Sequence, residues 1–417
     1  MSGVERLDGG PRSAVVVGAG VVGLSTAWFL QERGVDVTVV DRTGVAAGAS
    51  WGNAGWIAPG LAIPLNEPAV LRYGLRSLFD PAAPLHIPLT ADPGLWSFLT
   101  RFAAQCRWSS WTRAAKANLP LNEESIEAYD VLTANGVGAP TFDAPITAAF
   151  TTAEQARGLL RELERLARAG QPVEHAELSA VELGVPLASS ALTAGVRIDG
   201  QRFVDPGGFV QALGRSVVVR GATIRSFEVA DVVAERGGVS VRTAEGSAIK
   251  ADVAVLATGA WLPRLAGRTG VRTPVRAGRG YSFTVPVDRP VPGPVYLPEV
   301  RVACTPYQGK LRVAGTMEFR DPDAPLDEAR VDAIIKSVRP LFDGVAWDER
   351  TDVWVGPRPV TPDGRALIGA TRTPGVYVAG GHGMWGLAQG PVTGRLLAEQ
   401  ITTGKQPGAL REFDPLR

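Results

Sequence analysis

The sequence predicts an α/β protein in which a Rossmann-like dinucleotide-binding domain is interleaved with an α+β domain that contains an antiparallel sheet. Three observations support this fold class. A strand, the pattern Gly18-Ala19-Gly20-Val21-Val22-Gly23, a helix and a second strand follow one another within residues 14–42. Near the C-terminus, residues 375–401 repeat the order of strand, glycine-rich turn and helix. Between these segments, residues 271–345 contain alternating apolar and polar stretches that are typical of antiparallel strands.

Length and composition narrow the class of protein. A chain of 417 residues favours two domains or one elaborated domain. With 43 basic and 42 acidic residues, the net charge of +1 indicates no binding surface for nucleic acid or an anionic membrane. Two cysteines and three well-separated histidines predict neither a disulfide framework nor a metal site. We expect a cytoplasmic protein without a transmembrane segment, and peripheral association with a membrane stays open.

The uncharged residues 14–30 allow two interpretations. They could form a membrane or export segment, but the run is shorter than the roughly 20 residues that span a bilayer, and it contains three glycines. In a dinucleotide site, Gly18 permits a tight turn, Gly20 lets the backbone approach a pyrophosphate, and Gly23 lets the helix pack on the strand. The N–H groups at the start of that helix would then face the phosphates. This second interpretation explains more of the residues.

Asp41 ends the second predicted strand, where a carboxylate can accept hydrogen bonds from ribose hydroxyls and would repel a 2′-phosphate. This residue does not distinguish NAD from FAD. Residues 44–60 are rich in glycine and alanine, and they do not continue the strand–helix alternation expected of an NAD-linked dehydrogenase. The second glycine-rich turn at the C-terminus suits the flavin ring of FAD, which extends beyond the pyrophosphate. We therefore predict FAD, with NAD as the alternative.

Two further segments are candidates for contact with the flavin. In "GGHGMWG", residues 380–386, backbone N–H groups and the following helix could stabilise negative charge on the ring, although an ordinary turn would look similar. The small residues of that helix would let it lie close to the ring; they are Gly386, Ala388, Gly390 and Gly394. In "SWGNAGW", residues 50–56, polar side chains could bond the ring and small ones could let it approach the backbone. The residues concerned are Ser50, Asn53, Ala54 and Gly55, with Trp56 as a pocket wall or a core residue.

Arg358 is the candidate for binding a substrate. It stands between Pro357 and Pro359, which hold the local backbone extended and limit the positions of the guanidinium. A positioned guanidinium suits bidentate binding of a carboxylate, whereas the alternative is a solvated surface arginine. Tyr281 and Tyr307 lie in the antiparallel stretches and either border the site or only pack.

The two domains are expected to interleave along the chain. The dinucleotide-binding domain is predicted at residues 12–62, 203–270 and 350–417, and the substrate-binding domain at residues 63–202 and 271–349. The second domain should contain an amphipathic helix within residues 151–170. Asp205 and Pro206 should begin a helix of the first domain.

Taken together, several segments resemble the FAD-dependent D-amino-acid dehydrogenases, within the wider family of glycine, sarcosine and D-amino-acid oxidases. These segments include residues 15–42, "GNAGWIAPG", "GYSFTVPV", "RVACTPYQGKLRVAGTME", "RPVTPDGRALIG" and "GHGMWG". They run in order from about residue 13 to 405, and residues 80–190 match most loosely. The resemblance implies a glutathione-reductase-like flavoprotein fold of the D-amino-acid oxidase type.

The resemblance also implies a set of site residues. FAD would be bound non-covalently, because the cysteine that anchors flavin in some sarcosine oxidases is missing near Arg358. Arg358 would bind the substrate carboxylate. Met384 or Trp385 stands where glycine oxidases carry a second arginine, which favours a larger apolar substrate. The implied contacts with the cofactor are Gly18, Gly20, Val21, Val22, Gly23, Asp41, Arg42, Ser50, Asn53, Ala54, Gly55, Trp56, Val229, Thr258, Gly259, Trp261, His382, Gly383, Met384, Trp385, Gly386 and Leu387.

The implied reaction is oxidation of the carbon–nitrogen bond of a D-amino acid or an N-substituted glycine. Hydride would pass from the carbon beside the amine to flavin N5, and the imine would hydrolyse to an oxo acid, or to glyoxylate and an amine. Flavin carries this chemistry, so no side chain is assigned a catalytic proton transfer. Oxygen or a quinone-type carrier would accept the electrons. The alternatives are a flavin-binding subunit of a heteromeric dehydrogenase and an NAD-linked dehydrogenase.

Overall fold

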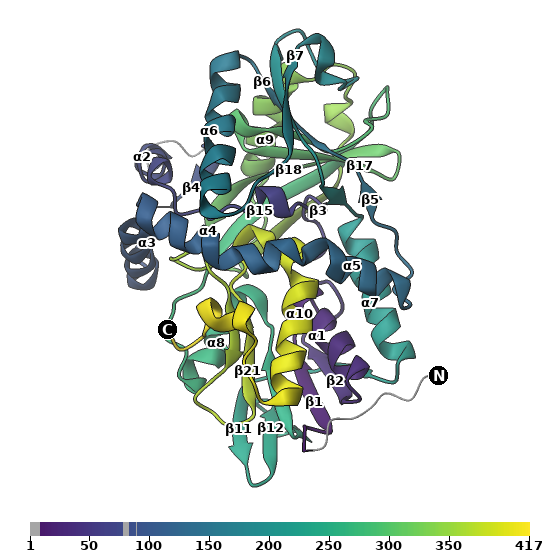
Figure 1. Cartoon of the computed structure of the whole chain (residues 1–417), viewed down its shortest axis with the longest axis vertical. Coiled ribbons are helices and arrows are strands. Elements are labelled where there is room, and N and C mark those ends of the chain that lie inside the picture. The colour runs from purple at the N-terminus through teal and green to yellow at the C-terminus, as the bar shows by residue number, and fades with distance from the viewer. Residues whose placement is uncertain (1–8, 78–82, 89) are drawn as a thin grey trace.

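The structure is a computed structural model that describes residues 9–77, 83–88 and 90–417. Figure 1 shows two halves stacked along the long axis, the lower one built around a six-stranded sheet and the upper one around a nine-stranded sheet. Each half draws on segments that lie far apart in the sequence. The predicted α/β class with interleaved halves is therefore confirmed.

The lower sheet has the strand order β10-β2-β1-β14-β21-β20, and its pairs are parallel except for β20 with β21. Its four central strands are short and rich in valine, which suits burial on both faces. They are β1 (Ser13–Val17), β2 (Asp36–Asp41), β10 (Thr223–Ser226), β14 (Val253–Leu256), β20 (Leu367–Ala370) and β21 (Val376–Gly380). The carboxyl ends of β1, β2, β14 and β21 thus meet at one edge of the sheet, where ligands bind in this architecture.

Alternate residues of these strands enter two different cores. Val16, Val39 and Val255 pack against the helices α1 (Val21–Glu32), α7 (Pro206–Val219) and α10 (Gly386–Thr403). Val15, Val40 and Leu256 pack against a three-stranded antiparallel sheet and α8 (Leu262–Ala266). That small sheet consists of β11 (Asp231–Glu235), β12 (Gly238–Arg242) and β13 (Ala248–Ala251). As predicted, Asp205 begins α7, and its side chain accepts a hydrogen bond from the N–H of Gly208.

Two small residues of α10, Gly390 and Gly394, serve a different purpose from the one expected. A Cβ at Gly394 would lie 2.6 Å from the backbone of Ser25, and one at Gly390 would lie 3.2 Å from Val21. These two glycines therefore let α10 pack closely on α1, and neither lines the cavity between the two halves. The reason is the direction of the helix, which runs down the side of the sheet beside α1 (Figure 1).

The upper sheet has the order β19-β15-β18-β17-β16-β6-β8-β7, with β4 paired to β18. It is mixed and not purely antiparallel, because β6 pairs parallel with β16 and β4 parallel with β18. Its strands are β4 (Leu85–His86), β6 (Ile146–Phe150), β7 (His175–Ser179), β8 (Ala194–Ile198), β15 (Arg276–Val285), β16 (Val295–Leu297), β17 (Val302–Tyr307), β18 (Lys310–Phe319) and β19 (Thr351–Val360). Two helices cover the sheet, namely α9 (Glu328–Val338) and the predicted amphipathic helix α6 (Ala153–Ala169).

Two of the expected domain limits differ from the observed packing. The limit at residue 350 puts β19 with the dinucleotide-binding domain, yet all of β19 lies beside β15 in the upper sheet. The helices α4 (Trp108–Glu123) and α5 (Ser125–Ala134) come from the segment assigned to the substrate domain, but Leu121 and Leu132 enter the same core as α1. The hydroxyl of Tyr129 also donates a hydrogen bond to the carbonyl of Leu387 at 2.8 Å. Tertiary packing decides these limits, and composition along the chain does not reveal them.

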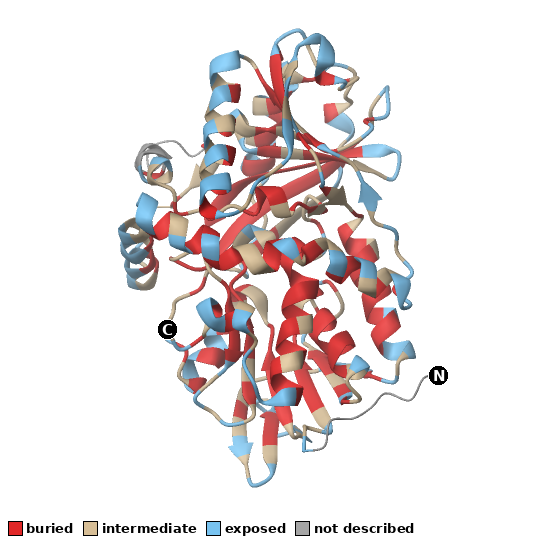
Figure 2. Ribbon diagram, in the orientation of Figure 1, coloured by how far each residue is buried: buried red, intermediate tan, exposed pale blue. Residues whose placement is uncertain are grey.

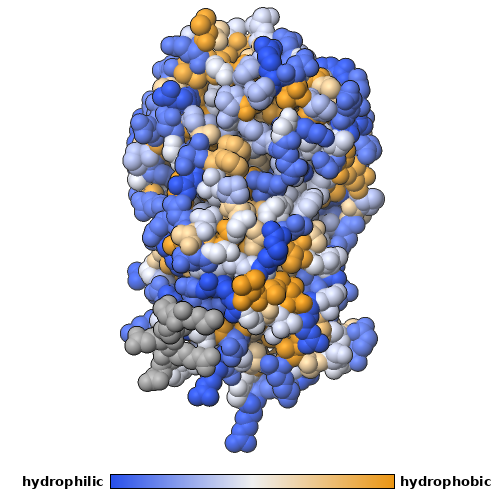
Figure 3. Space-filling view, turned by 90° about the vertical axis from the view of Figure 1, so that its right-hand side faces the viewer, coloured by the Kyte–Doolittle hydropathy of each residue, from blue (hydrophilic) through white to orange (hydrophobic). Residues whose placement is uncertain are grey.

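The remaining elements lie at the edges. The helices α2 (Pro68–Ser77) and α3 (Pro93–Gln105) lie on one side of the molecule, and β3 (Trp56–Ile57), β5 (Phe142–Asp143) and β9 (Arg202–Phe203) form a small sheet between the halves. Figure 2 shows that burial is concentrated in the sheets and in α1 and α10, whereas one face of α6 is exposed. On the face in Figure 3, hydrophilic side chains predominate around a few hydrophobic groups. No helix in the part of the chain that the structure describes is both long and apolar enough to cross a membrane.

Candidate active site

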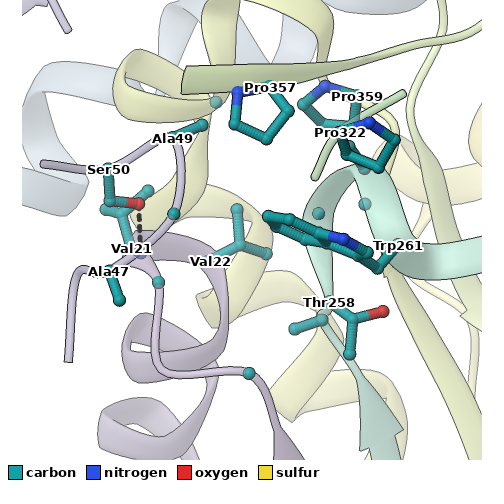
Figure 4. Close-up of a pocket in the computed structure, with 18 of the residues that line it drawn as sticks. Val21, Val22, Ala47, Ala49, Ser50, Thr258, Trp261, Pro322, Pro357 and Pro359 are labelled. Carbon is teal, nitrogen blue, oxygen red and sulfur yellow. Dashed lines mark hydrogen bonds between the residues drawn. The ribbon is translucent and has the colours of Figure 1, made fainter. Parts of the chain in front are cut away.

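A cavity of about 420 Å³ lies where the two halves meet. Its lower wall comes from the loops that follow β1, β2, β14 and β21, and its upper wall from β15, β18 and β19. Figure 4 shows part of it, with Ser50 and Val22 on one side and the indole of Trp261 on the other, below Pro322 and Pro359. The cavity is thus at the edge of the sheet where a dinucleotide is expected.

The glycine turn after β1 has the geometry of a phosphate cradle. Gly18 has φ of +113°, and a Cβ there would lie 2.4 Å from the carbonyl oxygen of Ala257. Gly20 precedes the first residue of α1, so the free N–H groups of the helix point toward the cavity. Gly23 does not line the cavity, because a Cβ there would meet the carbonyl oxygen of Gly18 at 2.0 Å. The absence of a side chain at Gly23 allows α1 to pack against the turn at Gly18.

Side chains from neighbouring loops fix this turn. The carboxylate of Asp41 accepts hydrogen bonds from the backbone N–H of Ala19 at 2.9 Å and of Thr43 at 2.8 Å, and it also lines the cavity. The hydroxyl of Ser50 accepts the N–H of Val21 at 3.0 Å (Figure 4). Asp41 thus joins the strand end to the glycine turn while it faces the cavity.

The loop of residues 50–56 only partly reaches the cavity. Ser50 and Asn53 line it, whereas Ala54, Gly55 and Trp56 do not. A Cβ at Gly55 would lie 2.2 Å from the carbonyl oxygen of Val204, so this glycine is needed for packing on the chain beside it. The indole N–H of Trp56 donates to the hydroxyl of Thr305 at 2.8 Å, and its ring packs edge-on against Tyr296. The structure therefore makes Trp56 a packing residue between the sheets.

The C-terminal turn contributes a second wall. His382, Gly383, Met384, Gly386 and Leu387 line the cavity. The ring of His382 is 5% exposed and contacts the hydroxyl of Thr393 at 3.0 Å, and burial lowers the pKa of His382 to about 4. This histidine is therefore neutral near pH 7. Trp385 turns away from the cavity, because its indole N–H donates to the carbonyl of Ile63 at 2.9 Å.

Arg358 projects from β19 into the upper wall of the cavity. Its Nη1 donates a hydrogen bond to the carbonyl of Thr316 at 2.8 Å, and among the described residues no carboxylate pairs with it. Burial lowers the pKa of Arg358 to about 10, so the guanidinium stays protonated at neutral pH. A half-buried cation without an acidic partner is suited to bind an anionic group of a ligand.

An irregularity in the sheet orients this arginine. The pairing of β15 with β18 shifts between Arg279 and Tyr281, so that Thr316 and Met317 face a single residue of β15. Thr316 has φ of +59°, which is rare for a β-branched residue. This bulge directs the carbonyl of Thr316 toward Arg358.

The two tyrosine candidates do not offer their hydroxyls to a ligand. Tyr281 borders the cavity, but its hydroxyl donates to the buried carboxylate of Glu318 at 2.6 Å. Burial, together with that hydrogen bond, raises the pKa of Tyr281. Tyr307 does not line the cavity, and its ring lies 4.9 Å from the guanidinium of Arg312.

Residues 13–400 match the family model of the FAD dependent oxidoreductases. The chain belongs to this family. Two relatives are D-amino acid dehydrogenases. The one from Agrobacterium fabrum (strain C58) is 30% identical over 94% of this chain and 96% of its own length. The one from Vibrio vulnificus (strain CMCP6) is 33% identical over the same shares.

Solved structures of other flavoproteins share the fold. Glycine oxidase from Geobacillus kaustophilus has a TM-score of 0.73 at 23% identity, covering 98% of both chains. L-alpha-glycerophosphate oxidase from Mycoplasma pneumoniae, solved with FAD bound, has a TM-score of 0.72 at 20% identity, covering 94% of this chain and 95% of that one. The predicted D-amino-acid oxidase-type fold and the resemblance to D-amino-acid dehydrogenases are confirmed.

FAD is the cofactor of this family, and the residues of the cavity fit it. Side chains at Gly18 and Gly23 would collide with the backbone carbonyls of Ala257 and Gly18, so the turn presents bare backbone at the edge of the cavity. The hydroxyl of Thr258 lines the cavity and has no hydrogen-bond partner among the described residues. Val229, Gly259 and Trp261 also line it, as the resemblance implied. The prediction of FAD is thus confirmed by the family, and the alternative of NAD is not supported.

Among the residues of the FAD-dependent oxidoreductase site that were not expected from the sequence, two stand out by their contacts. Trp354 lines the cavity next to Arg358, although no periodicity or motif singles it out. The sequence offers one indication: Trp354 precedes Gly356 and the Pro-Arg-Pro triplet in one extended segment, which puts it on the same face of the strand as Arg358. Asp323, in the loop between β18 and α9, is the second.

Asp323 joins the two halves beside the cavity. Its carboxylate accepts hydrogen bonds from Arg42 at 2.7 Å, from the indole of Trp261 at 2.9 Å and from Arg264 at 2.7 Å. Burial favours the neutral acid, but the hydrogen bonds from Arg42, Arg264 and Trp261 hold the pKa of Asp323 below its usual value. The guanidinium of Arg42 also lies 4.6 Å from the centre of the Trp261 ring. Pro322 of the same loop lines the cavity (Figure 4). The hydrogen bonds of Asp323 to Arg42, Trp261 and Arg264 therefore close one side of the cavity.

Proposed function

We propose that this protein oxidises D-amino acids to 2-oxo acids, with FAD as its cofactor. The observation that carries the proposal is Arg358, a half-buried cation that lines the cavity beside the dinucleotide cradle and lacks a carboxylate partner among the described residues. The relatives named D-amino acid dehydrogenase, which align over 94% of this chain, favour a D-amino acid over an N-substituted glycine.

Three groups of residues are assigned to the cofactor in this proposal. The N–H groups at Gly20 and Val22 would hold the pyrophosphate, because that of Val21 already donates to the hydroxyl of Ser50. Oδ1 of Asp41 already accepts hydrogen bonds from Thr43 and Gly44, whereas Oδ2 accepts one from Ala19, so Oδ2 would accept a hydrogen bond from a ribose hydroxyl. Ser50, Thr258 and the turn of residues 382–387 would border the flavin. Neither cysteine lines the cavity, which supports non-covalent binding.

The protein would contribute positioning more than proton transfer. Bound FAD supplies the hydride acceptor. Arg358 would bind the substrate carboxylate through the N–H groups that Thr316 does not use, and this would fix the orientation of the Cα–H bond. The substrate amine must be neutral to lose hydride, so turnover should rise with pH. His382 adds no positive charge to the site near pH 7, and no side chain is assigned as a base.

The released imine would hydrolyse in water to a 2-oxo acid and ammonia. The proposal leaves oxygen and a quinone-type carrier as the two candidates for the electron acceptor. Reoxidation of the reduced enzyme in air, compared with reoxidation by a soluble quinone without air, decides between them. We propose a cytoplasmic location, which the two buried free thiols favour.

The test is the visible spectrum of the purified flavoprotein, mixed without air with D-amino acids, their L-enantiomers and N-methylglycine. Bleaching of the flavin band by D-amino acids is expected. Bleaching by N-methylglycine alone would move the assignment to N-substituted glycines. A flavin band that no amino acid bleaches would favour a flavin-binding subunit whose chemistry needs a partner chain.

Arg358→Ala provides the control for the site. The variant should retain FAD and lose bleaching by amino acids. If it is reduced as fast as the wild type, Arg358 does not bind the substrate. Arg365→Ala is the matched variant, because Arg365 pairs with Asp363 and Glu412 and does not line the cavity.

A further inference from the structure

We propose that Trp354 determines the side-chain specificity of this enzyme, by forming an apolar wall beside the guanidinium that binds the carboxylate. This inference rests on the proposed function, and it names the substrate class. The preferred substrates are amino acids with a large apolar side chain, and small or dicarboxylic amino acids are poor substrates.

A pair of opposed glycines places the two side chains together. Gly280 on β15 and Gly356 on β19 are direct Cα partners in an antiparallel pair. A Cβ at Gly280 would lie 2.2 Å from Cζ of Arg358, and a Cβ at Gly356 would lie 1.9 Å from Cη2 of Trp354. Opposed Cβ positions point to the same face and are separated by about 4.5–5.5 Å. The guanidinium and the indole therefore lie next to each other on the face of the sheet that lines the cavity.

The indole is held in this position from both sides. A Cβ at Gly52, in the loop that also carries Ser50, would lie 2.4 Å from Cδ2 of Trp354. The ring is thus enclosed between the backbone of that loop and the backbone of β19. Neither position has space for a side chain, so the ring cannot swing aside without moving one of the two segments. Trp354 is a rigid wall and not an adaptable one.

The charges around the cavity argue against a second carboxylate on the substrate. Arg42, Arg264 and Arg358 are the arginines among the described residues that line it. Arg42 and Arg264 are both hydrogen-bonded to Asp323, which leaves Arg358 for the α-carboxylate. On the face of the sheet that carries Arg358, Trp354 and Ala314 also line the cavity, and neither carries a charge that could pair with a carboxylate. A side-chain carboxylate would meet apolar surface there without a partner.

The test uses non-reducible carboxylates, because they report on the wall without requiring turnover. Acetate and phenylacetate are titrated into the oxidised holoenzyme, and binding is followed by the change in the visible flavin spectrum. Wild type should bind phenylacetate at least about tenfold more tightly than acetate, since a pocket discriminates by roughly that factor for small apolar groups. Trp354→Ala should reduce this ratio below about threefold while acetate affinity changes little. Trp354→Phe should restore most of it.

Trp96→Ala is the matched control, because this tryptophan of α3 is 38% exposed and does not line the cavity. An unchanged ratio in Trp354→Ala would overturn the inference. An equal loss of affinity for both ligands would overturn it as well, since Trp354 would then only support Arg358. The same order should appear in kcat/KM for D-phenylalanine relative to D-alanine. If the ligands behave as expected but no amino acid bleaches the flavin, the proposed function fails and the inference about the wall stands.

Discussion

The guanidinium of Arg358 lies so close to the backbone of Gly280 that a Cβ at Gly280 would come within 2.1 Å of Nη2. Gly280→Ala should therefore push the guanidinium away from its position beside the bulge. We expect KM for the amino-acid substrate to rise about tenfold or more, which corresponds to roughly 1.4 kcal/mol of lost binding, with a smaller change in kcat. Steady-state kinetics with an excess of the electron acceptor measure both constants.

Gly278→Ala is the control for this prediction. It adds the same methyl group to the same strand, but its Cβ would meet Val360 and Met317 instead of the guanidinium. If both variants raise KM equally, strain in β15 explains the effect and the position of Arg358 does not.

Asp323→Asn should accelerate the release of FAD. The carboxylate bonds Arg42, Trp261 and Arg264 across the cavity, and an amide of the same shape loses the charge that strengthens two of these contacts. Because these groups are partly exposed, we expect only a roughly three- to tenfold faster release. Flavin fluorescence after dilution of the holoenzyme measures the rate. Asp348→Asn, which removes an exposed ion pair with Arg339, should leave the rate unchanged. Equal rates of FAD release from the wild type and both variants would show that the hydrogen bonds of Asp323 do not retain the cofactor.

His382→Gln should flatten the pH dependence of stability in mild acid. The folded pKa of His382 is about 4 and its ordinary value is 6.5, so the unfolded chain binds a proton first as the pH falls. This difference lowers the free energy of unfolding between pH 6.5 and pH 4, by about 2 kcal/mol from this residue between pH 7.5 and pH 5. Urea unfolding at the two pH values measures the loss, which should be smaller in the variant. The exposed His175, changed to Gln, serves as control. An unaltered pH dependence in His382→Gln would contradict the prediction.

Gly18→Ala should abolish FAD binding and destabilise the protein. Its Cβ would meet the backbone carbonyl of Ala257, which cannot move aside as a flexible side chain could. Gly237→Ala is the matched variant, since Gly237 also has positive φ, of +88°, but lies in open space. Gly237→Ala should lower the free energy of unfolding by only about 1–2 kcal/mol, and the protein should keep its FAD. The flavin content of the purified proteins tests this prediction. A Gly18→Ala protein with a full complement of FAD would show that the glycine turn at residue 18 is not needed to bind the cofactor.

The candidate site divides into residues that the sequence identifies and residues that it does not. Gly18, Gly20 and Asp41 are close in sequence, and their roles depend on one strand–turn–helix–strand unit whose geometry is local. Arg358 is singled out by its flanking prolines together with the resemblance to the D-amino-acid dehydrogenases, because the prolines alone would also fit a solvated surface arginine. By contrast, Trp56 and Trp385 are aromatic residues inside site motifs, yet both turn away from the cavity and donate to oxygens of distant segments.

The sequence by itself determined the α/β class, the interleaving of two halves and the cofactor, and it named Arg358 as the candidate for substrate binding, because each depends on short-range patterns or on their order along the chain. Only the tertiary structure decided that β19 belongs to the upper sheet, that Trp354 lies beside Arg358 and that Asp323 closes the cavity. These features arise from pairing between segments that are tens to hundreds of residues apart. Such pairing depends on the packing of whole sheets, because the alternation of side chains within a strand shows which face is buried and not which distant strand lies beside it.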